Sequence, residues 1–185
     1  YNESMLDCCR SLDEIKQTGI NFDQFVCLGR CNYLKMEAKR PNQQHLYPSK
    51  QSKEPIIKPQ LDEKEEINAP DDNTNEHKQA ETGTGRKYFS IDEFRQDIKL
   101  SCVSSNDPVV IVSYSRKGLK QTGDGHFSPI GGYHRDKDMC LIMDVARFKY
   151  PPHWVSTQVL YNAMCRVDAS CNKTRGWIVA TCAGI

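Results

Sequence analysis

The sequence predicts an α+β fold, because a helical pattern opens the chain and short strands, arranged for antiparallel pairing, dominate its second half. A capping box at Ser90 marks the start of a helix. Two apolar runs, Pro108–Tyr114 and Met139–Met143, are typical of strands that are buried on both faces. A long polar stretch, residues 39–87, separates the two parts of the chain.

Residues 1–38 are predicted to be the N-terminal part of one domain. From Ser4 to Lys16 apolar side chains recur every three or four residues, which predicts an amphipathic helix. Gly19 is suited to end that helix, since glycine adopts the left-handed conformation at low cost. A short strand is expected next, at Phe25–Leu28.

Residues 39–87 are predicted to be a disordered polar insertion. The segment has only eight apolar residues, too few to offset the entropy cost of ordering it. Its nine basic and nine acidic residues cancel, so it is not a charged tail aimed at an oppositely charged partner.

Residues 88–185 are predicted to be the C-terminal part of the domain. Ser90 and Glu93 form the capping box of a helix that runs from Ile91 to about Leu100, and Phe89 and Phe94 flank its start. Further predicted elements follow in chain order. They are a strand at His126–His134 with a bulge at Gly131–Gly132, a polar turn at Arg135–Asp138, a helix from Ser156 to about Cys165, and a closing strand at Trp177–Ala180.

The overall charge argues against two classes of partner. With 25 basic and 24 acidic residues the formal charge is +1, so no strong field attracts nucleic acid or an anionic membrane. No apolar run is long enough to span a bilayer, and the first residues lack a signal-peptide pattern. A cytoplasmic protein is expected. Because the chain begins with Tyr1, it is expected to be a piece of a longer protein.

His126 and Asp144 are the candidate catalytic pair. They flank a hairpin whose turn centres near residues 136 and 137, so the outer ends of its strands come close. Ideal pairing places Arg147 opposite His126, and a shift of about three residues is needed to bring Asp144 there. A carboxylate in an apolar strand needs a donor, which an imidazole supplies. The alternative is a structural ion pair between Asp144 and Arg147, with His126 an ordinary loop residue.

Three stretches resemble phytochelatin synthases: Glu3–Cys9, Thr122–His134 and Asp144–Val155. Weaker similarity surrounds Cys27–Cys31 and Ser90–Cys102. The resemblance implies a papain-like fold, incomplete at its N-terminus, with an antiparallel sheet and flanking helices. It also implies that His126 is the general base and that Asp144 orients it.

The implied activity is a two-step acyl transfer. A cysteine thiolate attacks glutathione, glycine leaves, and the γ-glutamylcysteinyl thioester passes to a second glutathione or to a phytochelatin. Arg147 and Tyr150 are the implied substrate-binding residues. Two alternatives stay open: a hydrolase of the same superfamily that cleaves glutathione, and a thiolate metal-binding protein without catalysis.

The nucleophilic cysteine is the point where this sequence departs from the family pattern. In the family it lies upstream of the motif matched by Glu3–Cys9, so it is expected before Tyr1, and this fragment is expected to be inactive. Cys8 and Cys9 are poor substitutes, because they fall more than a turn into their predicted helix, away from the N-terminus that lowers a thiol pKa.

Four cysteines, Cys8, Cys9, Cys27 and Cys31, are candidate metal ligands. The total of nine cysteines is odd, which favours reduced thiols over a disulfide framework. Adjacent cysteines on a helix point to different faces, and the gap between Cys27 and Cys31 departs from zinc-knuckle spacing, so core packing is the favoured reading of the four. The implied cadmium or zinc is expected mainly as a glutathione thiolate complex.

Overall fold

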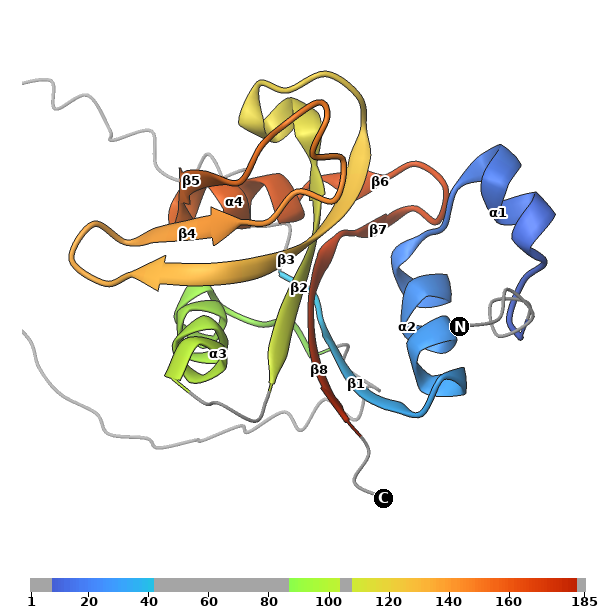
Figure 1. Ribbon diagram of the computed structural model, residues 1–185, viewed down its shortest axis with the longest axis horizontal. Helices are drawn as coiled ribbons and strands as arrows, with labels where there is room; N and C mark the ends of the chain where they lie inside the picture. Colours follow the sequence, from blue (N-terminus) through green and yellow to red (C-terminus); the bar gives the residue numbers. More distant parts are fainter. Residues whose placement is uncertain (1–7, 42–86, 104–107, 183–185) are drawn as a thin grey trace, which may run out of the picture. The chain divides into compact units, whose positions relative to one another are not determined.

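A six-stranded antiparallel sheet with helices against it forms the centre of the molecule (Figure 1). The computed structural model describes residues 8–41, 87–103 and 108–182. The arrangement confirms the α+β class. None of the helices in these residues is long and apolar enough to cross a membrane.

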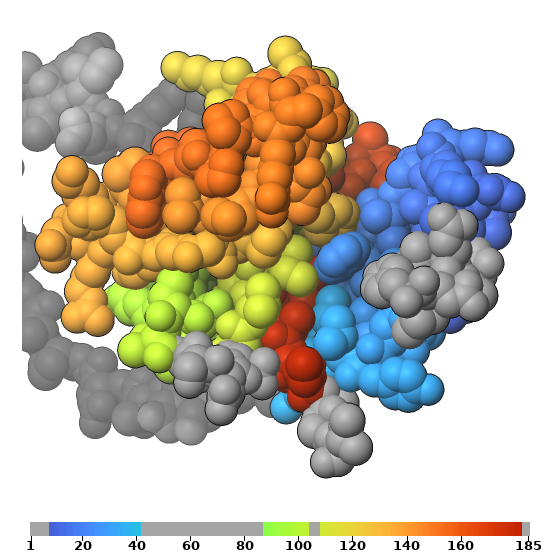
Figure 2. All heavy atoms as spheres, in the orientation of Figure 1, coloured from blue at the N-terminus to red at the C-terminus, as the bar shows by residue number. Residues whose placement is uncertain are grey.

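The sheet joins strands from both parts of the chain. Its spatial order is β1-β8-β2-β3-β4-β5, so that the strand before the polar stretch pairs with the last strand. The space-filling view shows the N-terminal segment packed along β8 (Figure 2). The bounds are Leu34–Lys39 for β1, Val109–Ser115 for β2, Gly125–His134 for β3, Met139–Ile142 for β4, His153–Ser156 for β5 and Gly176–Cys182 for β8.

Helices lie against the sheet, and a small hairpin of two short strands precedes β8. Two separate apolar clusters result, one involving α3 and α4 and the other involving α2. The bounds are Leu12–Thr18 for α1, Phe22–Cys31 for α2, Ile91–Val103 for α3, Arg116–Leu119 for the 3-10 helix η3, Thr157–Met164 for α4, Val167–Asp168 for β6 and Lys173–Thr174 for β7.

Strand β8 contributes to both clusters, because successive side chains point to opposite faces. Trp177 is fully buried in the cluster with Phe94, and its neighbour Ile178 is fully buried with Val26 of α2. The indole Nε1 of Trp177 donates to Asp97 Oδ2 (2.7 Å), which satisfies a polar atom in the core. The closing strand predicted from the sequence is therefore central to the fold.

The predicted start of α3 is confirmed in detail. The backbone N–H of Ser90 donates to Glu93 Oε2 (2.7 Å), and the Glu93 N–H donates to Ser90 Oγ (3.2 Å). Phe89 and Phe94 both pack on Trp177. The helix runs three residues beyond Leu100, to Val103.

The bulge, turn and strands of the second part are also confirmed. The pairing of β3 with β4 shifts between Ile130 and Gly132, and residues 135–138 form the turn. Ser156 precedes α4 as predicted, although its side chain makes no capping hydrogen bond.

The prediction of a helix over Ser4–Lys16 is wrong in its extent. Residues 8–10 are bends, and α1 begins only at Leu12, where Ser11 Oγ accepts from the Glu14 N–H (3.3 Å). Serine at this position satisfies a free backbone donor, so the helix starts there rather than earlier. Gly19 ends α1 with a φ of 75°, as predicted. The part of the prediction before residue 8 lies outside the described residues.

The predicted strand at Phe25–Leu28 is wrong, because those residues belong to α2. Asn21 and Gln24 form a capping box, in which each side chain accepts from the other's backbone N–H (3.0 and 2.9 Å). The buried residues Phe22 and Val26 are four apart, which is the helical period. The cap and the burial period outweigh the β propensity of the short apolar run.

The predicted boundary after residue 38 shifts slightly. Lys39 belongs to β1, and Pro41 forms a bridge with Phe89. Residues 42–86 of the predicted disordered insertion lie outside the described residues.

Candidate active site

His126 and Asp144 are in direct contact. His126 lies near the start of β3, and its Nε2 is 2.8 Å from Asp144 Oδ1. The side chain of Asp144 is fully buried and that of His126 is 19% exposed. The sequence-predicted pair is thus brought together, with one edge of the imidazole left accessible.

The hairpin achieves this contact with a smaller register shift than expected. Gly132 faces Leu141 while Ile130 faces Ile142, so the bulge moves the pairing by one residue. The predicted shift of three residues is wrong. Strand β4 ends at Ile142, and Asp144 lies in the segment that follows it rather than within a strand.

Asp144 is held by two further donors. The Ala146 N–H donates to Oδ1 (2.8 Å), and Arg116 Nη2 lies 3.0 Å from Oδ1 and 2.9 Å from Oδ2. Arg147, the alternative partner considered from the sequence, is exposed and has no ion pair with Asp144. The structural ion pair therefore exists, but with Arg116, and it coexists with the His126 contact.

Arg116 is a site residue that sequence reasoning missed. It begins η3 directly after β2, is 5% exposed, and donates from Nη1 to Gln121 Oε1 (2.9 Å). A signal was present: Tyr114 pairs with His126 across the sheet, so a charged residue two positions later lies near the histidine. Only the fold shows that its guanidinium reaches Asp144, 28 residues away in sequence.

The protonation states follow from these contacts. Burial lowers the pKa of His126, and the positive charge of Arg116 lowers it further, while Asp144 opposes both. Burial raises the pKa of Asp144, but the Ala146 N–H, His126 and Arg116 together bring it below its ordinary value. At neutral pH the pair is therefore a carboxylate and a neutral imidazole. Because Oδ1 is the acceptor, the ring proton is on Nε2 and the lone pair of Nδ1 is free to take a proton.

A cavity of about 530 Å³ borders the two chain neighbours of His126, Gly125 and Phe127. Its lining also includes Asp168 and Arg175. Arg175 is 4% exposed and its Nη1 donates to Asp168 Oδ2 (2.8 Å), while its buried Nε has no partner among the described residues. A Cβ on Gly125 would overlap the Arg175 guanidinium, so only glycine allows this close approach. Sequence reasoning missed this cavity.

Comparison with known proteins identifies the family of this chain. The family model for phytochelatin synthase matches residues 1–177. This chain belongs to the phytochelatin synthase family. The proteins named glutathione gamma-glutamylcysteinyltransferase 1 of Lotus japonicus and of Arabidopsis thaliana are 41% and 38% identical to it, each over 97% of this chain. The glutathione gamma-glutamylcysteinyltransferase of Schizosaccharomyces pombe is 33% identical over 97% of the chain.

The chain spans only part of these relatives. The matched residues make up 26% of the Lotus protein, 27% of the Arabidopsis protein and 32% of the Schizosaccharomyces protein. Membership of the phytochelatin synthase family confirms the resemblance inferred from three short motifs.

Arg147 and Tyr150, the substrate-binding residues implied by the family, lie on the segment after β4. Arg147 is exposed, and no ion pair or hydrogen bond joins it to another described residue. The Tyr150 hydroxyl accepts from the Thr122 N–H (2.8 Å) and lies 3.0 Å from Thr122 Oγ1, and these hydrogen bonds lower the pKa of Tyr150. The Arg116 guanidinium packs over the Tyr150 ring at 4.8 Å. Tyr150 thus anchors the segment close to the catalytic pair.

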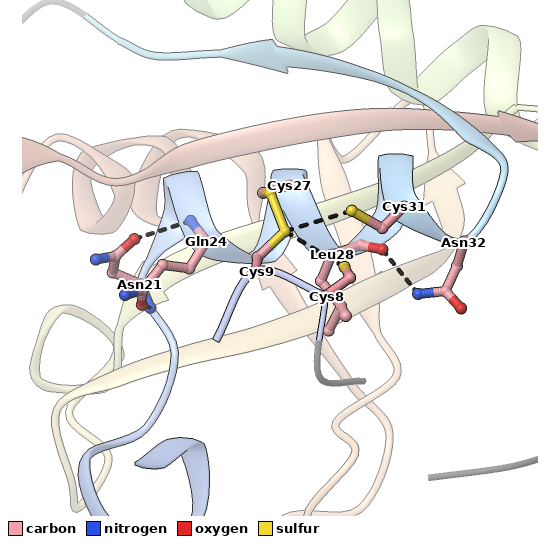
Figure 3. Close-up of a disulfide and its surroundings, with 8 residues drawn as sticks. All are labelled: Cys8, Cys9, Asn21, Gln24, Cys27, Leu28, Cys31 and Asn32. Atoms are coloured by element: carbon pink, nitrogen blue, oxygen red, sulfur yellow. Dashed lines mark hydrogen bonds between the residues drawn. A yellow bond between two sulfur atoms is a disulfide. The ribbon is translucent and has the colours of Figure 1, made fainter. Parts of the chain in front are cut away.

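The four candidate metal ligands lie together, and we call them the cysteine cluster. Cys9 and Cys27 form a disulfide, and Cys9 Sγ lies 3.4 Å from Cys8 Sγ and 3.5 Å from Cys31 Sγ (Figure 3). The sulfurs of Cys8, Cys9 and Cys31 all lie within 4.8 Å of one another, so they can hold a metal ion. Hydrogen bonding to Cys31 raises the pKa of Cys8.

Three expectations about the cluster were wrong. The disulfide contradicts fully reduced thiols. Core packing fails for Cys8 and Cys31, which are exposed. The side chains of Cys8 and Cys9 do lie on the same side, because residues 8–10 are not helical. Cys27 and Cys31 share one face of α2, because residues four apart in a helix lie on the same face.

Proposed function

We propose that the whole protein is a transferase that moves the γ-glutamylcysteinyl unit of glutathione to a second glutathione or to a phytochelatin. One observation carries the proposal. The imidazole of His126 is held through Nε2 by a buried carboxylate at 2.8 Å, which leaves Nδ1 as a base for a thiol. The relatives named above are glutathione gamma-glutamylcysteinyltransferases, which agrees with this chemistry.

The reaction needs one proton carrier that works in both directions. Nδ1 of His126 takes the proton of a cysteine thiol, and the thiolate attacks the carbonyl of the Cys–Gly amide of glutathione. The imidazolium then protonates the departing glycine amine, and a thioester remains. In the second half, the amine of the acceptor attacks the thioester, and the neutral His126 takes a proton from that amine and gives it to the departing cysteine thiolate. Asp144 stabilises the imidazolium throughout.

The cavity that borders Gly125 is proposed to bind the amino-acid end of the γ-glutamyl group. That end carries a carboxylate and an ammonium group, and the cavity offers Arg175 for the first and Asp168 for the second. Binding there places the rest of the substrate toward Gly125 and His126. Arg147, which is exposed on the segment after β4, is proposed as a second clamp for a substrate carboxylate, and Tyr150 is proposed to add a hydrogen bond to the substrate.

Further parts of the proposal concern the fold, the nucleophile, the metal and the compartment. An imidazole on an antiparallel strand beside a buried carboxylate supports a papain-like arrangement, in which a cysteine preceding this segment supplies the thiol. Cadmium or zinc enters bound to the sulfur of glutathione, since both ions prefer thiolate ligands. A cytoplasmic location agrees with the use of reduced glutathione as substrate.

Product analysis of the full-length protein tests the proposal. With glutathione and Cd²⁺, chromatography with mass spectrometry is expected to show free glycine together with γ-glutamylcysteine oligomers. γ-Glutamylcysteine without oligomers would indicate hydrolysis instead of transfer. Metal binding without glycine release would indicate a metal-binding protein without catalysis.

Two variants with matched controls connect the products to the site. His126→Ala and Asp144→Asn are expected to abolish glycine release. His134→Ala, on the same strand outside the pair, and Asp136→Asn, in the exposed turn, are expected to retain it. Full activity in His126→Ala would refute the assignment of the base.

A further inference from the structure

The cysteine cluster joins two segments that are distant in sequence. Cys27 and Cys31 project from α2 one turn apart, and Cys8 and Cys9 reach them from the segment before α1 (Figure 3). Cys9 Sγ is the centre of the group, since it is bonded to Cys27 and lies 3.4 Å from Cys8 Sγ and 3.5 Å from Cys31 Sγ.

One sulfur atom thus takes part in two incompatible structures. Cys9 belongs to the disulfide, and it also belongs to the group of three sulfurs that can hold a metal ion. A disulfide sulfur carries no thiolate charge, and a soft divalent ion requires thiolates. While the disulfide is closed, Cys9 and Cys27 are both lost as ligands.

We propose that the cysteine cluster is a redox-gated metal site, closed by the Cys9–Cys27 disulfide and opened by its reduction. The reduced cluster offers up to four thiolates from Cys8, Cys9, Cys27 and Cys31 to one Cd²⁺ or Zn²⁺ ion, and four is the coordination number that zinc adopts in structural thiolate sites. The metal and the disulfide exclude each other.

We call this redox control of metal binding the gate. The gate is separate from the His126 site, and it rests on the proposed function only in taking glutathione as the reductant.

The opening reaction is an ordinary thiol–disulfide exchange. A glutathione thiolate attacks Cys27 Sγ, the bond to Cys9 Sγ breaks, and Cys9 leaves as a thiolate. A second glutathione thiolate attacks the mixed disulfide, which releases oxidised glutathione and frees Cys27. Two electrons pass from two glutathione molecules to the protein disulfide, and the reverse reaction with oxidised glutathione closes the gate.

The disulfide is accessible to such a reagent. A cavity of about 480 Å³ borders Cys27 and Cys31, and Cys27 itself is exposed. Arg30 and Asp23 line the same cavity, and because Asp23 is ion-paired with Arg40 and Lys173, Arg30 adds a positive charge that favours an anionic tripeptide. Cys8 and Cys31 lie within 3.5 Å of Cys9 Sγ, so they can also exchange with the disulfide internally.

Metal binding and reduction must therefore support each other. An ion that binds only the reduced cluster shifts the dithiol–disulfide equilibrium toward reduction, and a reducing glutathione pool raises the metal affinity by the same factor. The site would respond to metal when glutathione is plentiful and reduced, which is the condition under which glutathione can serve as substrate.

The test uses the protein equilibrated in glutathione buffers of different reduced-to-oxidised ratio and then freed of glutathione by anaerobic gel filtration, with Cd²⁺ added afterwards as the probe. Alkylation and peptide mass spectrometry measure the Cys9–Cys27 link, and the ultraviolet charge-transfer absorption of cadmium thiolate measures binding. The oxidised protein is expected to bind Cd²⁺ more than about 100-fold more weakly than the reduced protein. Loss of one hydrogen bond to a metal ligand already lowers metal affinity by up to about 100-fold, and the disulfide removes two ligands. Bound Cd²⁺ is also expected to protect Cys9 and Cys27 from oxidation.

Two variants separate the gate from general thiol effects. Cys9→Ser removes the shared sulfur, so Cd²⁺ binding is expected to be weak in every buffer and the ratio between buffers to fall to about one. Cys182→Ser, an exposed free cysteine elsewhere, is expected to retain the full ratio. Equal affinity of the oxidised and reduced parent protein, or an undiminished ratio in Cys9→Ser, would overturn the proposal.

Neither measurement depends on turnover. If the protein shows the gate but makes no γ-glutamylcysteine oligomers, the proposed transfer fails while the metal site stands. If it makes oligomers without any dependence of Cd²⁺ binding on the glutathione ratio, the gate fails and the transferase stands.

Discussion

The catalytic pair and the cysteine cluster both bring reactive side chains into contact, but in opposite surroundings. Asp144 is 1% exposed and is held by three donors from β3, η3 and its own segment. In the cysteine cluster, Cys8, Cys27 and Cys31 are all exposed, and Cys9 Sγ contacts the sulfurs of Cys8 and Cys31. The protein sets the protonation states of the first region, whereas solutes set the oxidation and metal states of the second.

The largest expected effect comes from the buried region. Asp144→Asn removes the charge that orients and stabilises the His126 imidazolium, so the rate of γ-glutamylcysteinyl transfer is expected to fall by about 10⁴-fold, as in other triad enzymes. Steady-state glycine release measures it, and thermal melting verifies that the variant is folded. A loss of less than tenfold would mean that Asp144 is only structural.

Removing Arg116 is expected to cost stability. Arg116→Met leaves the Asp144 carboxylate buried without its ion-pair partner, which is expected to lower the free energy of unfolding by about 3–5 kcal/mol. Urea titration followed by tryptophan fluorescence measures the change. Arg135→Met, in the exposed turn after β3, is the matched control and is expected to change stability by less than about 0.5 kcal/mol. Equal effects of the two substitutions would contradict the importance of burial.

Cysteines provide a direct contrast between buried and exposed positions. Cys165 is fully buried, so Cys165→Ser places a hydroxyl in the core. This substitution is expected to lower the free energy of unfolding by about 1–3 kcal/mol. Cys31→Ser, on the exposed face of α2, is expected to stay within about 0.5 kcal/mol. The same urea titration compares them, and a larger cost at Cys31 would show that the cluster supports the fold.

The smallest effect concerns pH. Burial and nearby cations lower the pKa of His126 below its ordinary value of 6.5, so the imidazole stays neutral at pH 6.5. The value of kcat/KM is therefore expected to fall only when the pH drops through the lowered pKa of His126. Lys149 is one of these cations, so Lys149→Met is expected to raise the pKa of His126 and move the acid limb upward by less than about one pH unit. Lys137→Met, in the exposed turn, leaves the limb in place. A downward shift in Lys149→Met would contradict the charge argument.

Local features of the fold were predictable from the sequence. The capping box at Ser90, the bulge in β3 and the turn at residues 135–138 follow from rules that operate over a few residues, and all are present. The hairpin also determined that His126 and Asp144 meet, since Asp144 directly follows the strand that pairs with the strand of His126. The strand expected at Phe25–Leu28 failed where a helix cap and a four-residue burial period coincided.

Contacts between distant segments were decided by the tertiary structure. Arg116 reaches Asp144 across 28 residues, and Arg175 packs on Gly125 from the far end of the chain. Cys9 meets Cys27 only because the chain bends before α1 and α2 is helical. Sequence periodicity reports which face of an element is buried, but not which other element covers it, so the charges and thiols brought together by packing could be seen only in the folded molecule.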